Sequence, residues 1–117
     1  MRTFEELKKI MNEIDSITVS RIASRNTDYK FTWNGTTYST NNSSPRFDVC
    51  KIIIKKKGDT QKYELLYFFD FLYCIGSFKP HAERFVMDNM PTTNSEEINS
   101  WCEKQKEHVL KCCKIVE

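Results

Sequence analysis

Cysteine and histidine residues near the C-terminus are the side chains best suited to metal chemistry. His108 precedes Cys112 by four residues, which would place the two side chains on adjacent turns of a helix. A structural zinc site needs a full tetrahedral set of ligands, and the chain has no paired Cys-x2-4-Cys knuckle. Cys102, Cys112 and Cys113 fall on or beside the apolar positions of this segment, where free cysteine packs as a small hydrophobe. We therefore predict core packing for these cysteines, with no metal and no other cofactor.

Catalytic chemistry has few candidate residues. A cysteine nucleophile needs a histidine base and a group that orients it, and His81 and His108 are the only histidines. The sequence lacks a Gly-x-Ser-x-Gly elbow, a Gly-rich phosphate loop, a His-Glu-x-x-His motif and a Cys-x-x-Cys motif. Asp70 interrupts an apolar run, where it could act as a general base with a histidine or simply cap a turn. We expect no enzyme, and the alternative is a small cavity enzyme of cystatin-like or similar α+β build.

Lysine is concentrated between residues 51 and 62, where five lysines against one aspartate give a local balance of +4, compared with +2 for the chain. A hairpin that turns at Gly58 and Asp59 sets Lys55 opposite Lys62, and like charges directly opposite destabilise a sheet unless an anion lies between them. A phosphate backbone or an acidic protein surface could supply this anion, although lysines also protect sheet edges from aggregation. We predict partner binding by the basic hairpin through five residues: Lys51, Lys55, Lys56, Lys57 and Lys62.

The segment 29–40 predicts a second, tighter hairpin. Asn34 and Gly35 supply the two positive φ angles of a type I′ turn, so Phe31 pairs with Tyr38 and Trp33 with Thr36. Because side chains alternate along a strand, the aromatic residues share one face and the polar residues share the other. We expect the aromatic face to join the core. The polar face is a secondary binding candidate made of Lys30, Thr32, Thr37 and Ser39.

Helices are predicted at both ends of the chain. Thr3 and Glu6 form a capping box at the start of a helix over residues 4–14, with its apolar face made of Phe4, Leu7, Ile10, Met11 and Ile14. A short helix begins near Pro80 and reaches Asn89. Thr93 and Glu96 form a second capping box before a long amphipathic helix, whose apolar stripe runs from Ile98 to Val116.

The middle of the chain predicts strands. A strand begins at Ser16 and ends near Asn26, and the basic hairpin extends from Phe47 toward Phe68. The run 65–75 is apolar on both alternate faces, so it fits a central strand or a strand that passes into a buried helix. The predicted fold is a single α+β domain over residues 1–117. It has an N-terminal helix and an antiparallel sheet of about five strands, with one face covered by the C-terminal helices.

Composition and the missing motifs favour a binding function. With 39% hydrophobic residues and no apolar run near the length of about 18 residues that a membrane span needs, we expect a soluble, cytoplasmic protein with reduced cysteines. Thirteen Lys against five Arg, eight Asn and two Ala indicate an A+T-rich genome. Small motif-poor proteins of such bacteria and their mobile genetic elements often act as inhibitors or immunity proteins.

We therefore expect a non-catalytic protein-binding module of the inhibitor or immunity type, for example anti-CRISPR-like. Its partner would be a larger protein, such as a nuclease or its nucleic-acid complex. The main alternative is a small basic nucleic-acid-binding domain that uses the same lysines, because basic patches bind phosphates. Arginine, the preferred reader of base edges, is scarce with five residues, which weakens this alternative.

Overall fold

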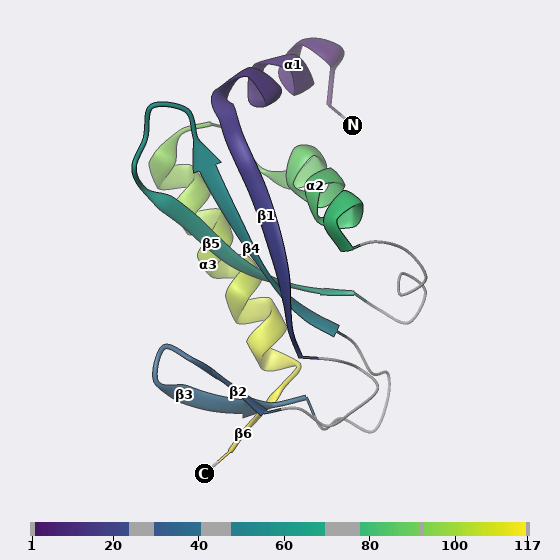
Figure 1. Cartoon of the computed structure of the whole chain (residues 1–117), viewed down its shortest axis with the longest axis vertical. Coiled ribbons are helices and arrows are strands. Elements are labelled where there is room, and N and C mark those ends of the chain that lie inside the picture. Colours follow the sequence, from purple (N-terminus) through teal and green to yellow (C-terminus); the bar gives the residue numbers. More distant parts are fainter. Residues whose placement is uncertain (1, 24–29, 41–47, 70–77, 92, 117) are drawn as a thin grey trace.

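The computed structural model describes residues 2–23, 30–40, 48–69, 78–91 and 93–116. Helices and antiparallel strands combine into an α+β fold with two small sheets (Figure 1). The elements, in chain order, are α1 (Phe4–Glu13), β1 (Ile14–Ala23), β2 (Lys30–Trp33), β3 (Thr36–Ser39), β4 (Asp48–Lys56), β5 (Lys62–Phe69), α2 (Phe78–Asn89), α3 (Ser95–Lys111) and β6 (Lys114–Ile115).

The larger sheet has the strand order β1-β4-β5, and both pairs of neighbours are antiparallel. Within it, Ile52 lies between Val19 of β1 and Leu65 of β5, and Ile54 lies opposite Tyr63. The register predicted for the basic hairpin is therefore confirmed. Alternate residues of β4 and β5 are fully buried on one face because α1, α2 and α3 supply apolar side chains to that face.

The smaller sheet has the order β2-β3-β6 and contains the predicted Asn-Gly hairpin. Phe31 pairs with Tyr38 and Trp33 with Thr36, and both turn residues have positive φ angles, 49° at Asn34 and 83° at Gly35. This hairpin does not extend the larger sheet, so the prediction of one sheet with about five strands is wrong. Its third strand is instead β6, at the C-terminal end of the chain.

Two hydrophobic cores lie on opposite faces of the larger sheet. The first fills the face covered by the helices and contains Ile10, Ile14, Ile52, Ile54, Tyr63, Leu65, Ala82, Val86, Met90, Ile98 and Cys102. The second lies on the reverse face, near the β2-β3 hairpin and the end of α3, and contains Phe31, Val49, Leu66 and Val109. The expectation of a sheet covered on one face is therefore wrong at this end, because the aromatic hairpin and α3 bury Leu66 and Val49 completely.

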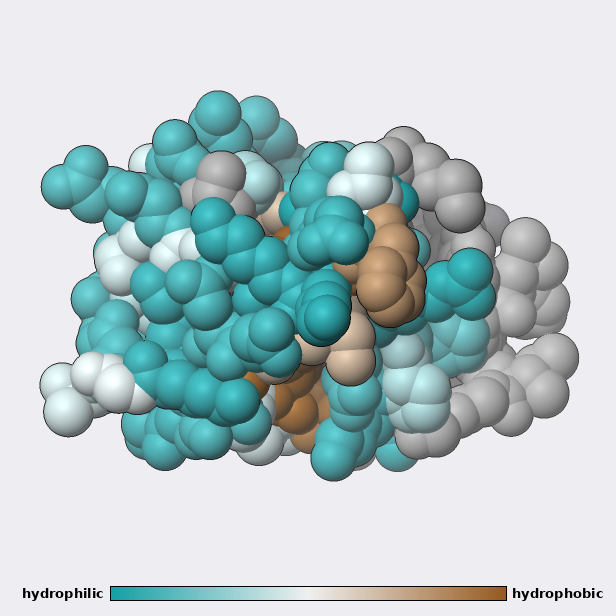
Figure 2. Space-filling model, turned by 90° about the horizontal axis from the view of Figure 1, so that it is seen from above, coloured by the Kyte–Doolittle hydropathy of each residue, from teal (hydrophilic) through white to brown (hydrophobic). Residues whose placement is uncertain are grey.

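Helix α1 begins as predicted but buries less than predicted. The Thr3 hydroxyl accepts a hydrogen bond from the Glu6 backbone N–H at 3.1 Å, which caps the helix. Ile10 is buried, whereas Phe4 and Met11 are 76% and 61% exposed. The helix ends at Glu13 and passes directly into β1, so only its last turn reaches the core. Figure 2 shows a mainly hydrophilic surface from above, with a few hydrophobic side chains exposed among the polar ones.

Helix α3 differs from its prediction at both ends. Its N-cap is Asn94, whose Oδ1 accepts from the N–H groups of Glu96 and Glu97 at 3.0 and 3.2 Å, so Thr93 is not the cap. The helix ends at Lys111, and the next residues pair with β3 instead of continuing the apolar stripe to Val116. The Val116 N–H donates to the Thr37 carbonyl at 2.9 Å, which fixes this segment as a strand.

The remaining predictions fall partly outside the described residues. Helix α2 begins at Phe78 and holds Pro80 in its first turn, as expected for a residue that lacks an N–H donor. The run 65–75 is a strand as far as Phe69, and Asp70 and the rest of the run lie outside the described residues. Among the helices that the structure describes, none combines the length and the apolar character that crossing a bilayer requires.

Candidate functional site

The lysine face is the exposed side of β4 and β5, made of Lys51, Ile53, Lys55, Lys62 and Glu64. Lys55 and Lys62 lie directly opposite each other and both are exposed. Two residues further along, Ile53 pairs with Glu64, and Lys51 lies beyond Ile53 on the same face by strand alternation. The structure therefore brings three of the five predicted lysines onto one surface.

The neighbouring strand β1 adds small hydroxyl side chains to the lysine face. Ser16 is opposite Lys55, Thr18 is opposite Ile53, and Ser20 is opposite Lys51. Thr18 and Ser20 are exposed, so the surface of the sheet along β1 is made of short polar side chains. The lysine face consequently offers ammonium groups beside hydroxyl donors, a combination that can bind an anionic surface.

No ion pair among the described residues balances the charge on the lysine face. Three lysines against Glu64 leave a formal charge of +2, and no described residue forms an ion pair with Lys51, Lys55 or Lys62. The two ammonium groups of Lys55 and Lys62 lie opposite each other, and their repulsion slightly destabilises the folded state. A bound anion would compensate for this repulsion. The arrangement can therefore hold a carboxylate or a phosphate between the two strands.

Lys56 and Lys57 are separated from the lysine face, which corrects the grouping of the five residues. Lys56 follows Lys55 in the strand and points to the opposite side, where its ammonium group donates to the Thr93 carbonyl oxygen in front of α3. Lys57 lies in the turn after β4, and its backbone N–H donates to the Glu13 carbonyl at 2.9 Å. Strand alternation separates adjacent lysines that a count along the sequence places together.

The turn of the basic hairpin is fixed to the start of α3 by a hydrogen-bonded network. The hydroxyl of the buried Tyr63 donates to the Asp59 carboxylate at 2.7 Å, and the Ser95 hydroxyl lies 2.7 Å from the Tyr63 hydroxyl oxygen. The Gln61 backbone N–H donates to Asp59 at 2.8 Å, and this bond is the main reason that the pKa of Asp59 lies below its ordinary value. Burial raises the pKa of Tyr63. The network holds the end of β5 that carries Lys62 in a defined position.

We predict that Tyr63→Phe lowers the free energy of unfolding by about 1–2 kcal/mol, because it removes a buried hydroxyl that joins two elements. Urea denaturation at neutral pH measures this loss, and an unchanged slope would show that the variant keeps the native compactness. Asp59 adds a pH dependence: its pKa is lowered in the folded state, so its contribution is present above about pH 3.8 and is lost as the pH falls through the folded value. A variant as stable as the parent at neutral pH would contradict the proposed role of the network.

The secondary binding candidates form a face that is only partly open. Lys30 and Thr32 are exposed, and the Thr32 and Thr37 hydroxyls lie 3.2 Å apart. Ser39 is 8% exposed, so the prediction that it belongs to an open binding face is wrong. Ser39 is buried because β6, from the C-terminal end of the chain, pairs with β3 at this residue. The sequence did not predict this long-range pairing.

The cysteine and histidine candidates that the structure describes show burial, ring stacking and hydrogen bonding to the backbone. Cys102 is buried in the first core, as predicted, and burial raises its pKa to about 12. Burial also raises the pKa of Cys113 to about 11. The His108 ring stacks on Phe68 at 5.4 Å, and the Cys112 thiol donates to the His108 backbone carbonyl. No group of three or more residues able to hold a metal ion occurs among the residues that the structure describes.

We predict that Cys102 does not react with iodoacetamide in the folded protein at pH 7.5. A pKa of about 12 leaves only a trace of thiolate at this pH, and the core excludes the reagent. Peptide mapping by mass spectrometry before and after denaturation in urea measures the labelling of each cysteine. Labelling of Cys102 in the native state at the rate of an unfolded control would contradict its burial.

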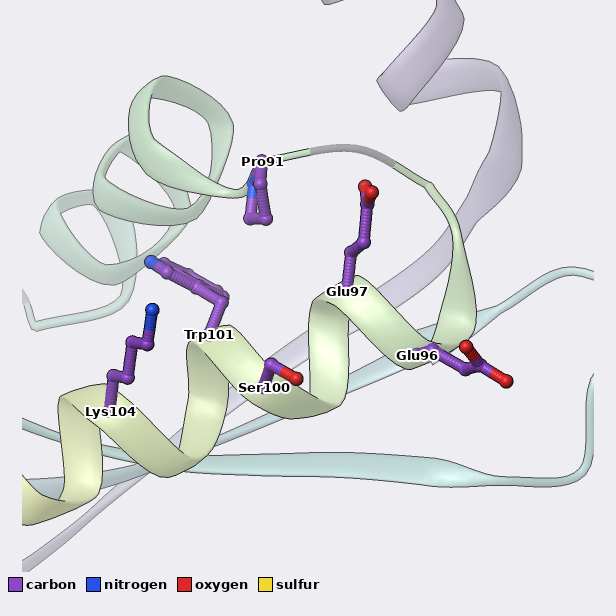
Figure 3. Close-up of a pocket in the computed structure, with 6 residues that line it drawn as sticks. All are labelled: Pro91, Glu96, Glu97, Ser100, Trp101 and Lys104. Carbon is purple, nitrogen blue, oxygen red and sulfur yellow. The ribbon is translucent and has the colours of Figure 1, made fainter.

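A pocket that the sequence did not indicate lies between α3 and the segment that precedes it (Figure 3). Its volume is about 500 Å³, and it is lined by Pro91, Glu96, Glu97, Ser100, Trp101 and Lys104. The Trp101 ring stacks on Phe85 at 5.7 Å, and Phe85 contacts Tyr67 at 4.2 Å, so the wall is anchored in the first core. Glu96 and Glu97 also stabilise the positive end of α3, which explains their presence without a ligand.

Comparison of the chain with protein-family models, with curated proteins and with solved structures gives no match.

Proposed function

We propose that this protein is a non-catalytic binding module that docks on an acidic surface of a larger protein through the lysine face. The observation that carries the proposal is the position of Lys55 directly opposite Lys62 on an exposed sheet face. The repulsion between two exposed like charges that lie opposite each other in a sheet is compensated when an anionic partner lies over them. We extend this proposal to an inhibitor or immunity-type role, for example anti-CRISPR-like, in which docking blocks the partner.

Two features of the lysine face favour a protein partner over a nucleic acid. Ile53 is half-buried in its centre and offers the apolar contact that protein interfaces use and a phosphate backbone does not. Single-stranded nucleic acids are bound by exposed aromatic rings, but Phe31 and Trp33 pack in or against the second core. A small basic nucleic-acid-binding domain is therefore the alternative that the experiment must separate.

The proposal is tested by exchanging the charge of the lysine face. We expect the triple variant Lys51→Glu, Lys55→Glu, Lys62→Glu to weaken partner capture by tenfold or more, because attraction becomes repulsion at three positions. The matched control changes Lys8, Lys9 and Lys104 to Glu, three exposed lysines on α1 and α3. Capture from cells of the natural source, followed by quantitative mass spectrometry, compares the parent with both variants.

The expected result is one or more proteins retained by the parent and by the control and lost by the lysine-face variant. Equal capture by all three proteins would overturn the proposal. A labelled oligonucleotide, titrated at increasing salt, tests the alternative. Binding whose logarithm falls steeply with the logarithm of salt concentration, and which the triple variant abolishes, would assign the lysine face to nucleic acid instead.

A further inference from the structure

The outer face of the smaller sheet carries a second group of basic side chains. Lys30 of β2 lies opposite Ser39 of β3, and Ser39 lies opposite Lys114 of β6, so these three side chains point to the same side of the sheet. Thr32 and Thr37 form the next opposite pair and also lie on this side, because side chains alternate along each strand. We call Lys30, Thr32, Thr37 and Lys114 the second basic patch.

The second basic patch has positive charge without a neighbouring carboxylate in its own sheet. Lys30 and Lys114 are exposed, and neither forms an ion pair with a residue that the structure describes. The sequences of β2, β3 and β6 contain no aspartate or glutamate, so the patch has a formal charge of +2. The hydroxyls of Thr32 and Thr37, 3.2 Å apart, add hydrogen-bond donors on the same face. Ammonium groups beside hydroxyls favour an anionic ligand.

The second basic patch and the lysine face point to the same side of the molecule. Val49 and Leu66 lie on the lysine-bearing side of the larger sheet, and both share the second core with Phe31 of the hairpin. The hairpin therefore covers this side with its aromatic face, and its outer face points away from the larger sheet. Lys51 is directly opposite Leu66, so the lysine face extends to the hairpin. A step of about 10 Å, the usual distance between packed sheets, separates the two basic surfaces.

An acidic polypeptide fits the second basic patch better than a single-stranded nucleic acid. The aromatic rings of the hairpin, Phe31, Trp33 and Tyr38, lie on its inner face, in or against the second core. No ring of the hairpin therefore lies beside the two lysines for a base to stack on. The patch has the same sign of charge as the adjoining lysine face, which is the proposed docking surface for an acidic protein. One acidic chain that crosses the step can contact both surfaces.

We propose that the second basic patch binds an acidic segment of the same partner, so that docking uses two linked basic surfaces. This inference rests on the proposed function of the lysine face. Two linked contacts raise the affinity because binding at one surface holds the second acidic segment at a high effective concentration near the other. The partner that fits this arrangement is a protein whose acidic surface or loop extends across both sheets.

Oligoglutamates of two lengths test this linkage, because only the longer peptide can reach both surfaces. Triglutamate spans at most about 11 Å, and dodecaglutamate about 42 Å. Titration of the isotope-labelled protein, followed by amide chemical shifts in two-dimensional NMR, gives the dissociation constant and the residues contacted. We expect dodecaglutamate to bind the parent about tenfold or more tightly than triglutamate. It should shift the amide signals of Lys30 and Lys114 together with those of the lysine face.

The double variant Lys30→Glu, Lys114→Glu should remove this gain in affinity for the longer peptide. The matched control Lys8→Glu, Lys9→Glu makes the same change in net charge on α1, at the opposite end of the molecule from the smaller sheet (Figure 1). It should keep the gain. The amide signal of Val116, whose N–H donates to β3, reports whether β6 stays paired. If the glutamate variant loses this pairing, Lys30→Gln, Lys114→Gln carries the test, because it removes both charges without adding repulsion.

The outcomes separate this inference from the proposed function. Equal gains in the double variant and the control would overturn the second basic patch and leave the lysine face standing. Triglutamate binding that the lysine-face triple variant leaves unchanged would instead overturn the proposed function, while shifts of Lys30 and Lys114 would still assign an anion to the patch. A single-stranded oligothymidylate of similar length is the competing polyanion. If it binds more tightly than dodecaglutamate at the same salt concentration, and the double variant abolishes this binding, the acidic-protein partner is overturned.

Discussion

Replacement of Leu66 with alanine is expected to lower the free energy of unfolding by about 3 kcal/mol. Leu66 is completely buried in the second core, where Val49, Phe31 and Val109 surround it. Removing a large aliphatic side chain from such a site costs the lost burial and the cavity that remains, together about 2–5 kcal/mol. If the reverse face of the sheet were exposed to solvent, Leu66 would lie in water and its replacement would cost little. The expected loss in the free energy of unfolding therefore depends on the second core.

Neighbouring residues of β5 provide matched controls for Leu66→Ala. Leu65 points to the opposite face and is also completely buried, so Leu65→Ala should cost a similar amount. Glu64 is exposed, and Glu64→Ala should change the stability by no more than about 0.5 kcal/mol. Urea denaturation followed by circular dichroism measures all three. A loss for Leu66→Ala as small as that for Glu64→Ala would mean that the reverse face of the sheet is not packed.

Phe31→Ala is expected to destabilise the protein by about 3 kcal/mol or more, since a buried phenylalanine contributes a large apolar area. Phe31 stacks on Tyr38 at 5.7 Å and joins the smaller sheet to the second core. Thr32 lies on the other face of the same strand and is exposed, so Thr32→Ala should change the stability by less than about 0.5 kcal/mol. Similar losses for the two variants would contradict this packing.

The two tryptophans report on the two cores, which makes the coupling of the cores measurable. Trp101 packs against the first core and Trp33 against the second. Helix α3 spans both, because it supplies Ile98 to the first and Val109 to the second. Single-tryptophan variants should therefore show coincident unfolding transitions, and Phe31→Ala should shift both together. A shift of the Trp33 signal alone would show that the smaller sheet unfolds independently.

Lys106 reinforces the link between α3 and the smaller sheet. It is only 9% exposed, and its ammonium group lies 3.0 Å from the Glu103 carboxylate and 5.0 Å from the centre of the Trp33 ring. The ring face and the carboxylate together compensate for the loss of hydration of this charge. Lys106 is four residues after Cys102 and three before Val109, so it lies on the buried face of α3, at the part of the helix that the hairpin covers.

Local patterns in the sequence determined the elements and the pairing inside each hairpin. Asn34 and Gly35 fixed one turn, and the alternation around Gly58 and Asp59 fixed the register that sets Lys55 opposite Lys62. The cap of α1 at Thr3 was also predictable. These features involve residues close in the chain, where turn geometry and side-chain alternation leave few choices.

The tertiary structure alone decided which surfaces meet. The third strand of each sheet, β1 in one and β6 in the other, comes from a distant part of the chain, and no local pattern selects it. The pairing of β6 with β3 buried Ser39, and the packing of the β2-β3 hairpin and α3 against the reverse face covered Leu66. The physical reason is that many partners can satisfy the backbone hydrogen bonds of a strand, and only the combined packing of both cores distinguishes among them.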